Sequence, residues 1–128
     1  MKNHQNGFSL IGIFKAFKVS VRGLFVLARA EVNVILEFVL GITAISLGFL
    51  LNISKNEWMV ILIMVFLVIF AELINTAIEK IMDFIELEYN EKVRDIKDLS
   101  AGAVFLIVIL SIIIGLIIFG PKIFDLFV

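Results

Sequence analysis

The chain has 128 residues, of which 62% are hydrophobic and 18% are charged, and its formal net charge is -1. This composition is far more apolar than that of soluble domains and predicts an all-α integral membrane protein that forms one unit over residues 1–128. The chain has no surplus of basic residues, which argues against nucleic acid as a partner. The absence of cysteine excludes disulfides and a cysteine nucleophile.

Residues 8–29 are predicted to form an amphipathic helix that lies on the membrane surface. Four basic side chains fall within about 60° of one another on a helical wheel: Lys15, Lys18, Arg22 and Arg29. Such a basic face suits anionic headgroups, while the apolar faces suit the interface. Both a simple anchor and a gate for the substrate fit this pattern.

Three apolar segments are predicted to cross the bilayer, at about residues 32–52, 57–85 and 98–120. The third contains 22 consecutive uncharged residues, Leu99–Gly120. This stretch is long enough to cross the bilayer by itself, because about 20 apolar residues match a hydrocarbon core of about 30 Å. The second segment reaches full length only if its helix continues through Glu72 toward Glu79. Pro121 is expected to end the last helix.

The basic residues are distributed unevenly along the chain. Of the eleven Lys and Arg residues, five precede the first span, four lie between the second and third, and only Lys55 and Lys122 remain. By the positive-inside rule, the N-terminus and the 80–98 segment are expected in the cytoplasm, with the 52–57 turn and the C-terminus outside. The acidic residues of the spans then lie on the side where ATP is available.

Polar residues gather on one face of the second span. Five side chains fall within about 100° of one another at helical spacing: Glu72, Asn75, Thr76, Glu79 and Asp83. An ionised aspartate at mid-membrane costs about 2.5 to 3.5 kcal/mol, so these carboxylates must face protein, water or a cation. Hard oxygen ligands without Cys or His indicate Mg²⁺ or a similar metal. A polar face that merely lines a helix–helix contact is the alternative.

A second acidic cluster precedes the first span. Glu31 and Glu37 lie about 120° apart on a helix and cannot easily share one site. Glu31, at the expected membrane surface, is the better candidate metal ligand. For the deeper Glu37, a ligand role and a polar contact between helices are equally open.

A third cluster lies directly before the last span. Arg94 and Asp98 are spaced as an i, i+4 pair, which could be no more than a solvated ion pair. Lys97 could instead contact a phosphate as a point charge, with Asp98 orienting it. Both interpretations stand at this point.

The three clusters together contain the groups that phosphoryl transfer requires. The phosphate-loop pattern and the protein-kinase motifs are absent from the sequence. The reaction needs only positioned reactants, a metal to neutralise phosphate charge and a base for the attacking hydroxyl. An ion or proton pathway is the first alternative, although the outer halves of the spans are apolar. A non-catalytic membrane assembly protein is the second.

The sequence resembles the small prokaryotic diacylglycerol kinases and their undecaprenol kinase relatives. The resemblance rests on AELINTAIEKIMD at 71–83, KDLSAGAV at 97–104 and AEVN at 30–33, and it extends from Phe14 to Pro121. It implies a homotrimer in the bacterial cytoplasmic membrane, with active sites shared between protomers. It also implies transfer of the ATP γ-phosphoryl group to a lipid hydroxyl, either of diacylglycerol or of undecaprenol.

The resemblance also implies a role for each acidic residue of the metal and base sites. Glu72 would be the general base toward the lipid hydroxyl. Glu31 and Glu79 would hold Mg²⁺ on the nucleotide phosphates.

The remaining roles concern the nucleotide. Asn75 would support the metal arrangement, Asp83 and Asp98 would help to hold the nucleotide or order the site, and Lys97 would contact phosphate. Members of the family often carry an Arg and then a polar or His residue where this chain has VILE at residues 34–37. The contact that this Arg makes is therefore in doubt here.

Overall fold

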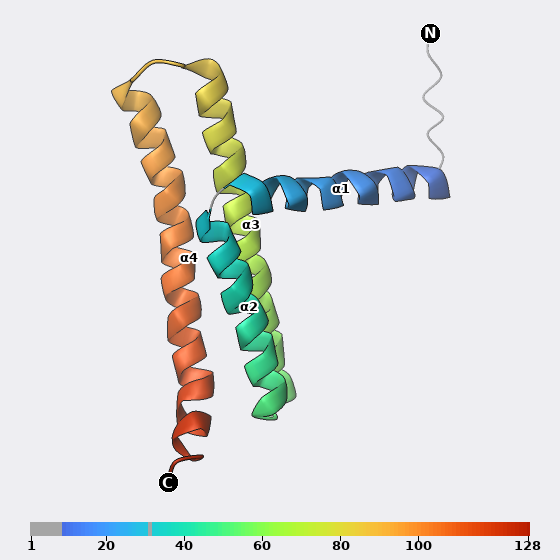
Figure 1. The fold of residues 1–128 in the computed structure, drawn as a ribbon, viewed down its shortest axis with the longest axis vertical. Helices are drawn as coiled ribbons and strands as arrows, with labels where there is room; N and C mark the ends of the chain where they lie inside the picture. The colour runs from blue at the N-terminus through green and yellow to red at the C-terminus, as the bar shows by residue number, and fades with distance from the viewer. Residues whose placement is uncertain (1–8, 31) are drawn as a thin grey trace.

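The computed structural model describes residues 9–30 and 32–128, which form four helices. These are α1 (Leu10–Ala30), α2 (Val32–Leu50), α3 (Lys55–Ile85) and α4 (Glu91–Phe124). Helices α2, α3 and α4 run alongside one another, and α1 projects crosswise from them and contacts both α2 and α3 (Figure 1). The predicted all-α class is confirmed for these residues.

Three of the four helices, α2, α3 and α4, are long and apolar enough to cross a membrane. Their outward side chains are apolar and exposed, for example Phe66 at 69%, Phe105 at 63% and Leu116 at 67%. Water would be a poor solvent for such a surface, whereas hydrocarbon solvates it well. The predicted layout of one amphipathic helix and three spans matches these elements.

The helix ends differ from the prediction mainly in α4. The prediction that Pro121 ends this helix is wrong, because the helix continues to Phe124 and the Pro121 carbonyl accepts a hydrogen bond from the Asp125 N–H at 3.0 Å. Proline lacks its own N–H but keeps a carbonyl acceptor, so near a helix end it removes only one bond. At its other end α4 starts at Glu91, well before the apolar stretch, where the Asn90 side chain accepts from the Lys92 N–H at 2.9 Å.

A capping box starts α3 at the end of the bundle that holds the C-terminus. The Ser54 N–H donates to Glu57 Oε2 at 2.7 Å, and the Glu57 N–H donates to Ser54 Oγ at 3.3 Å. The Lys122 ammonium on α4 lies 3.2 Å from Glu57 Oε1. These contacts join the start of α3 to the last turn of α4.

The same end of the bundle contains a small apolar core. Its buried members come from the turn before α3, from α3 and from α4: Ile53, Ile61, Ile118 and Phe119. The Trp58 ring packs 4.7 Å from the ring of Phe49. A Cβ added at Gly48 would lie 2.7 Å from the Trp58 ring, so the absence of a side chain at Gly48 allows this close contact. At the opposite end α3 and α4 continue past the level of α1 to their connecting loop (Figure 1).

Candidate active site

The polar face of α3 runs from a buried to an exposed environment. Glu72, Asn75 and Thr76 are buried at 7%, 6% and 7% exposure, and they are the buried polar side chains among the described residues. Glu79, further along the helix, is half-buried, and Asp83 is exposed near the α3–α4 loop. The polar face of α3 therefore extends from the interior of the bundle to the solvent.

The side-chain amide of Asn75 connects α4 to the polar face of α3 by hydrogen bonds. The Ser100 hydroxyl donates to Oδ1 of Asn75, and Asn75 Nδ2 donates to Glu79 Oε1 at 3.3 Å. Asn75 and Glu79 are four residues apart in one helix, whereas Ser100 comes from the facing helix. Ser100 was not a predicted site residue, although it lies within the KDLSAGAV segment, three residues after Lys97.

An ion pair connects the same two helices closer to the loop. The Nζ atom of Lys97 lies 2.5 Å from Oδ1 of Asp83, and Glu79 attracts the Lys97 ammonium electrostatically. The sequence suggested Asp98 as the residue that orients Lys97. The structure places Asp83 there instead, because α3 and α4 pack against each other at this point.

Asp98 nevertheless shares a cavity with this ion pair. Asp83, Lys97 and Asp98 all line a space of about 350 Å³ beneath the α3–α4 loop. The structure thus brings together three of the six residues that were expected to bind the nucleotide.

Arg94 lines the same cavity but makes other contacts than the expected i, i+4 pair. Its guanidinium donates to the Tyr89 hydroxyl at 2.7 Å and lies 3.8 Å from Asp95. The guanidinium carbon is also 5.9 Å from the centre of the Tyr89 ring. These contacts hold Arg94 against the loop. The ion pair with Asp83 is made by Lys97.

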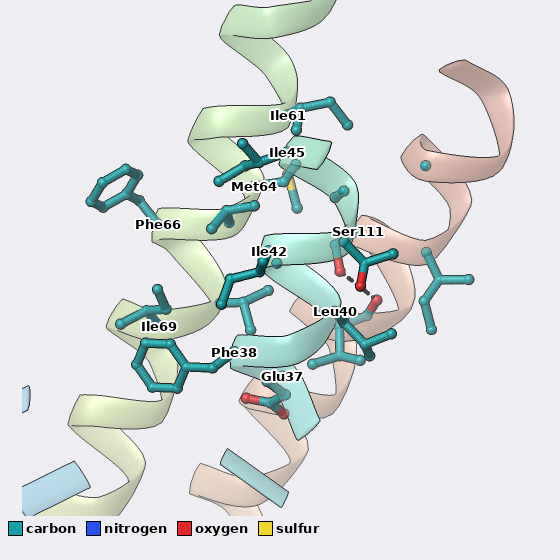
Figure 2. Close-up of a pocket in the computed structure, with 18 of the residues that line it drawn as sticks. Glu37, Phe38, Leu40, Ile42, Ile45, Ile61, Met64, Phe66, Ile69 and Ser111 are labelled. Atoms are coloured by element: carbon teal, nitrogen blue, oxygen red, sulfur yellow. Dashed lines mark hydrogen bonds between the residues drawn. The ribbon is translucent and has the colours of Figure 1, made fainter. Parts of the chain in front are cut away.

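Two predicted acidic residues lie elsewhere. Glu31 is outside the described residues. Glu37, on α2, is half-buried and lies at one end of a largely apolar cavity of about 470 Å³ between α2, α3 and α4, with Ile61 toward the opposite end (Figure 2). The lining of this cavity includes no residue of the Glu72–Asp83 face.

The Glu79 carboxylate fits a magnesium ion that binds together with a nucleotide. Within residues 9–30 and 32–128, no group of three or more His, Cys, Asp or Glu side chains forms a metal site by itself. Mg²⁺ usually takes one or two carboxylates and completes its shell with phosphates and water. The Glu79 carboxylate is a ligand of this kind, and the Asn75 amino group donates to it at 3.3 Å while the Asn75 carbonyl accepts from Ser100.

Comparison with known proteins connects this geometry to a family. The family described as prokaryotic diacylglycerol kinase matches residues 18–119, which include the whole polar face of α3 and the start of α4. An undecaprenol kinase from Bacillus subtilis is 37% identical over 121 residues, covering 94% of this chain and 97% of that protein. A diacylglycerol kinase from Pseudomonas aeruginosa is 29% identical over 99 residues, covering 77% of this chain and 72% of that protein.

Proposed function

Because the chain belongs to the prokaryotic diacylglycerol kinase family and is a membrane lipid kinase that uses ATP, we propose that its acceptor is undecaprenol. The similarity to an undecaprenol kinase carries this proposal, since it extends over 94% of this chain at 37% identity. The similarity to a diacylglycerol kinase is lower and covers less of both chains. Both lipids present a hydroxyl on a long apolar body, so the same reaction serves either.

Glu72 acts as the general base in the proposed reaction. Its carboxylate takes the proton of the lipid hydroxyl while the hydroxyl oxygen forms a bond to the γ-phosphorus of ATP. The bond between the γ-phosphorus and the β-γ bridging oxygen breaks, and ADP leaves. The place of Glu72 supports this role, because it is 7% exposed and lies within a candidate membrane span, one helical turn after the buried Val68.

Glu79 and Glu31 would hold Mg²⁺ on the phosphates, and Asn75 would support this arrangement. When bound, the ion would neutralise charge on the phosphate oxygens. The hydrogen bond from Asn75 to Glu79 supports this role, because it keeps the carboxylate in a defined orientation. Glu31 enters this set from the family resemblance and from its expected position at the membrane surface.

Lys97, Asp83 and Asp98 form the nucleotide-binding part of the site. Lys97 contacts a phosphate, Asp83 positions the Lys97 ammonium, and Asp98 helps to hold the nucleotide in the cavity that all three residues line. A cation at this place suits the negative charge of ATP.

We also propose that three chains assemble, with the site completed by a neighbouring protomer, and that the α3–α4 loop faces the cytoplasm. The family resemblance supports the trimer, and the concentration of basic residues in the segments on the loop side supports the orientation. The mass of the protein in detergent, corrected for bound detergent, should correspond to three chains. Since the chain lacks cysteine, single cysteines introduced at Asn56 and Glu88 can report sidedness through a membrane-impermeant thiol reagent.

The acceptor is tested by direct competition. Purified protein in mixed micelles, with labelled ATP, Mg²⁺ and equal mole fractions of undecaprenol and diacylglycerol, should label undecaprenol preferentially. Equal labelling of both lipids, or preferential labelling of diacylglycerol, would overturn the choice of acceptor without affecting the assignment as a lipid kinase.

A further inference from the structure

The Ser100 hydroxyl connects α4 to the proposed metal-binding group of α3 by a hydrogen bond. It donates to the carbonyl end of the Asn75 amide, and the amino end of the same amide donates to Glu79. We propose that Ser100 is a positioning residue that sets the orientation of Asn75 and thereby that of Glu79. This inference rests on the proposed function, which assigns Mg²⁺ to Glu79.

The orientation of Asn75 follows from the two unlike ends of its amide side chain. A carboxamide has a donor end and an acceptor end, and a carboxylate accepts only. The amino end of Asn75 therefore faces Glu79, and the carbonyl end points away toward α4. Asn75 is 6% exposed, so water has little access to this carbonyl, and the Ser100 hydroxyl provides its donor.

A second acceptor lies within reach of the Ser100 hydroxyl. The hydroxyl also lies 3.3 Å from the Lys97 carbonyl, to which it can donate instead. Donation to Lys97 would leave the buried Asn75 carbonyl without its donor, so the orientation of Asn75 depends on the hydroxyl donating to it as the structure shows. An alanine at this position provides no donor to the amide.

The chain offers a matched control on the same helix. Ser111 on α4 is also half-buried, but its hydroxyl donates to the Val108 carbonyl of its own helix at 2.8 Å. Removing the Ser111 hydroxyl changes the same chemical group without disturbing the α3 polar face.

The test measures metal binding rather than turnover alone. With full-length protein in micelles and a non-hydrolysable ATP analogue, Mn²⁺ affinity is measured by electron paramagnetic resonance for Ser100→Ala, Ser111→Ala and Glu79→Gln. Loss of a side chain that orients a metal ligand typically weakens metal affinity by about 10- to 100-fold, and this is the loss expected for Ser100→Ala. Ser111→Ala should bind Mn²⁺ as the unmodified protein does. The Mg²⁺ concentration for half-maximal activity should rise in Ser100→Ala, while the KM for the lipid stays unchanged.

The outcomes separate this inference from the proposed function. If Glu79→Gln weakens Mn²⁺ binding and Ser100→Ala does not, the role of Ser100 is overturned and that of Glu79 stands. If Glu79→Gln has no effect on Mn²⁺ binding, the metal assignment fails and the inference fails with it. Should Ser100→Ala fold poorly, Ser100→Thr retains the hydroxyl and should retain Mn²⁺ affinity, and a loss of affinity in folded Ser100→Thr would contradict the proposal.

Discussion

The Nζ atom of Lys97 on α4 lies 2.5 Å from Oδ1 of Asp83 on α3, beyond the buried part of the polar face. The two side chains are 35% and 65% exposed, so water screens much of their attraction. The pair therefore matters mainly for where it holds the ammonium, which is at the edge of the cavity that Asp98 also lines.

Replacing Lys97 should affect the binding of ATP more than the rate of transfer. Lys97→Ala removes a cation from the proposed phosphate position and should raise the KM for ATP about tenfold or more. Asp83→Asn leaves the ammonium in place but less well oriented, so a smaller increase is expected. Lys92→Ala, which changes an exposed lysine one turn earlier in α4, is the control. An unchanged KM for ATP in Lys97→Ala would argue against the phosphate contact.

The close contact between Gly48 and Trp58 predicts a stability effect remote from the site. Gly48→Ala places a methyl group 2.7 Å from the Trp58 ring. Overpacking of this kind costs about 1–3 kcal/mol of unfolding free energy. Gly115→Ala, where an added Cβ meets no atom within 4 Å, is the matched control.

Trp58 itself reports the effect, because it is the single tryptophan of the chain. Its fluorescence, followed during thermal unfolding in micelles, should show a lower transition temperature for Gly48→Ala only. Equal destabilisation by both substitutions would show that this contact does not determine the effect.

The capping box at the start of α3 should support stability without supporting catalysis. Ser54→Ala removes the side-chain acceptor of the Glu57 N–H, and loss of such a cap costs about 1 kcal/mol. The kcat at low temperature should be unchanged, because this cap lies at the end of the bundle away from the α3–α4 loop (Figure 1). Ser46→Ala serves as control, since that hydroxyl donates to the Ile42 carbonyl of its own helix at 2.8 Å. A loss of kcat in Ser54→Ala without a loss of stability would contradict this separation.

The polar face of α3 was predictable because it depends on the geometry of one helix. A repeat of 100° per residue places Glu72, Asn75 and Glu79 on the same side whatever the helix packs against. The burial of Glu72 agrees with the cost of exposing a carboxylate to lipid. The three spans were equally predictable, since their lengths and composition match a bilayer.

The contacts between helices were not predictable in the same way. Whether Lys97 meets Asp83 or Asp98, and whether Ser100 reaches Asn75, depends on the register in which α3 packs against α4. That register results from the packing of many apolar side chains, which spacing within one helix does not reveal. The capping box had a local signal, the sequence Ser54-x-x-Glu57, that the sequence analysis did not use.

The most direct test of the account is phosphate transfer by Glu72→Gln. The substitution keeps the size of the side chain and removes its capacity to accept the proton. Turnover with labelled ATP and undecaprenol in micelles should fall about 10²- to 10⁴-fold, while affinity for a non-hydrolysable ATP analogue stays unchanged. Asp125→Asn, the same type of change at an exposed position near the C-terminus, should retain full activity. Full turnover in Glu72→Gln would contradict the assignment of Glu72 as the base.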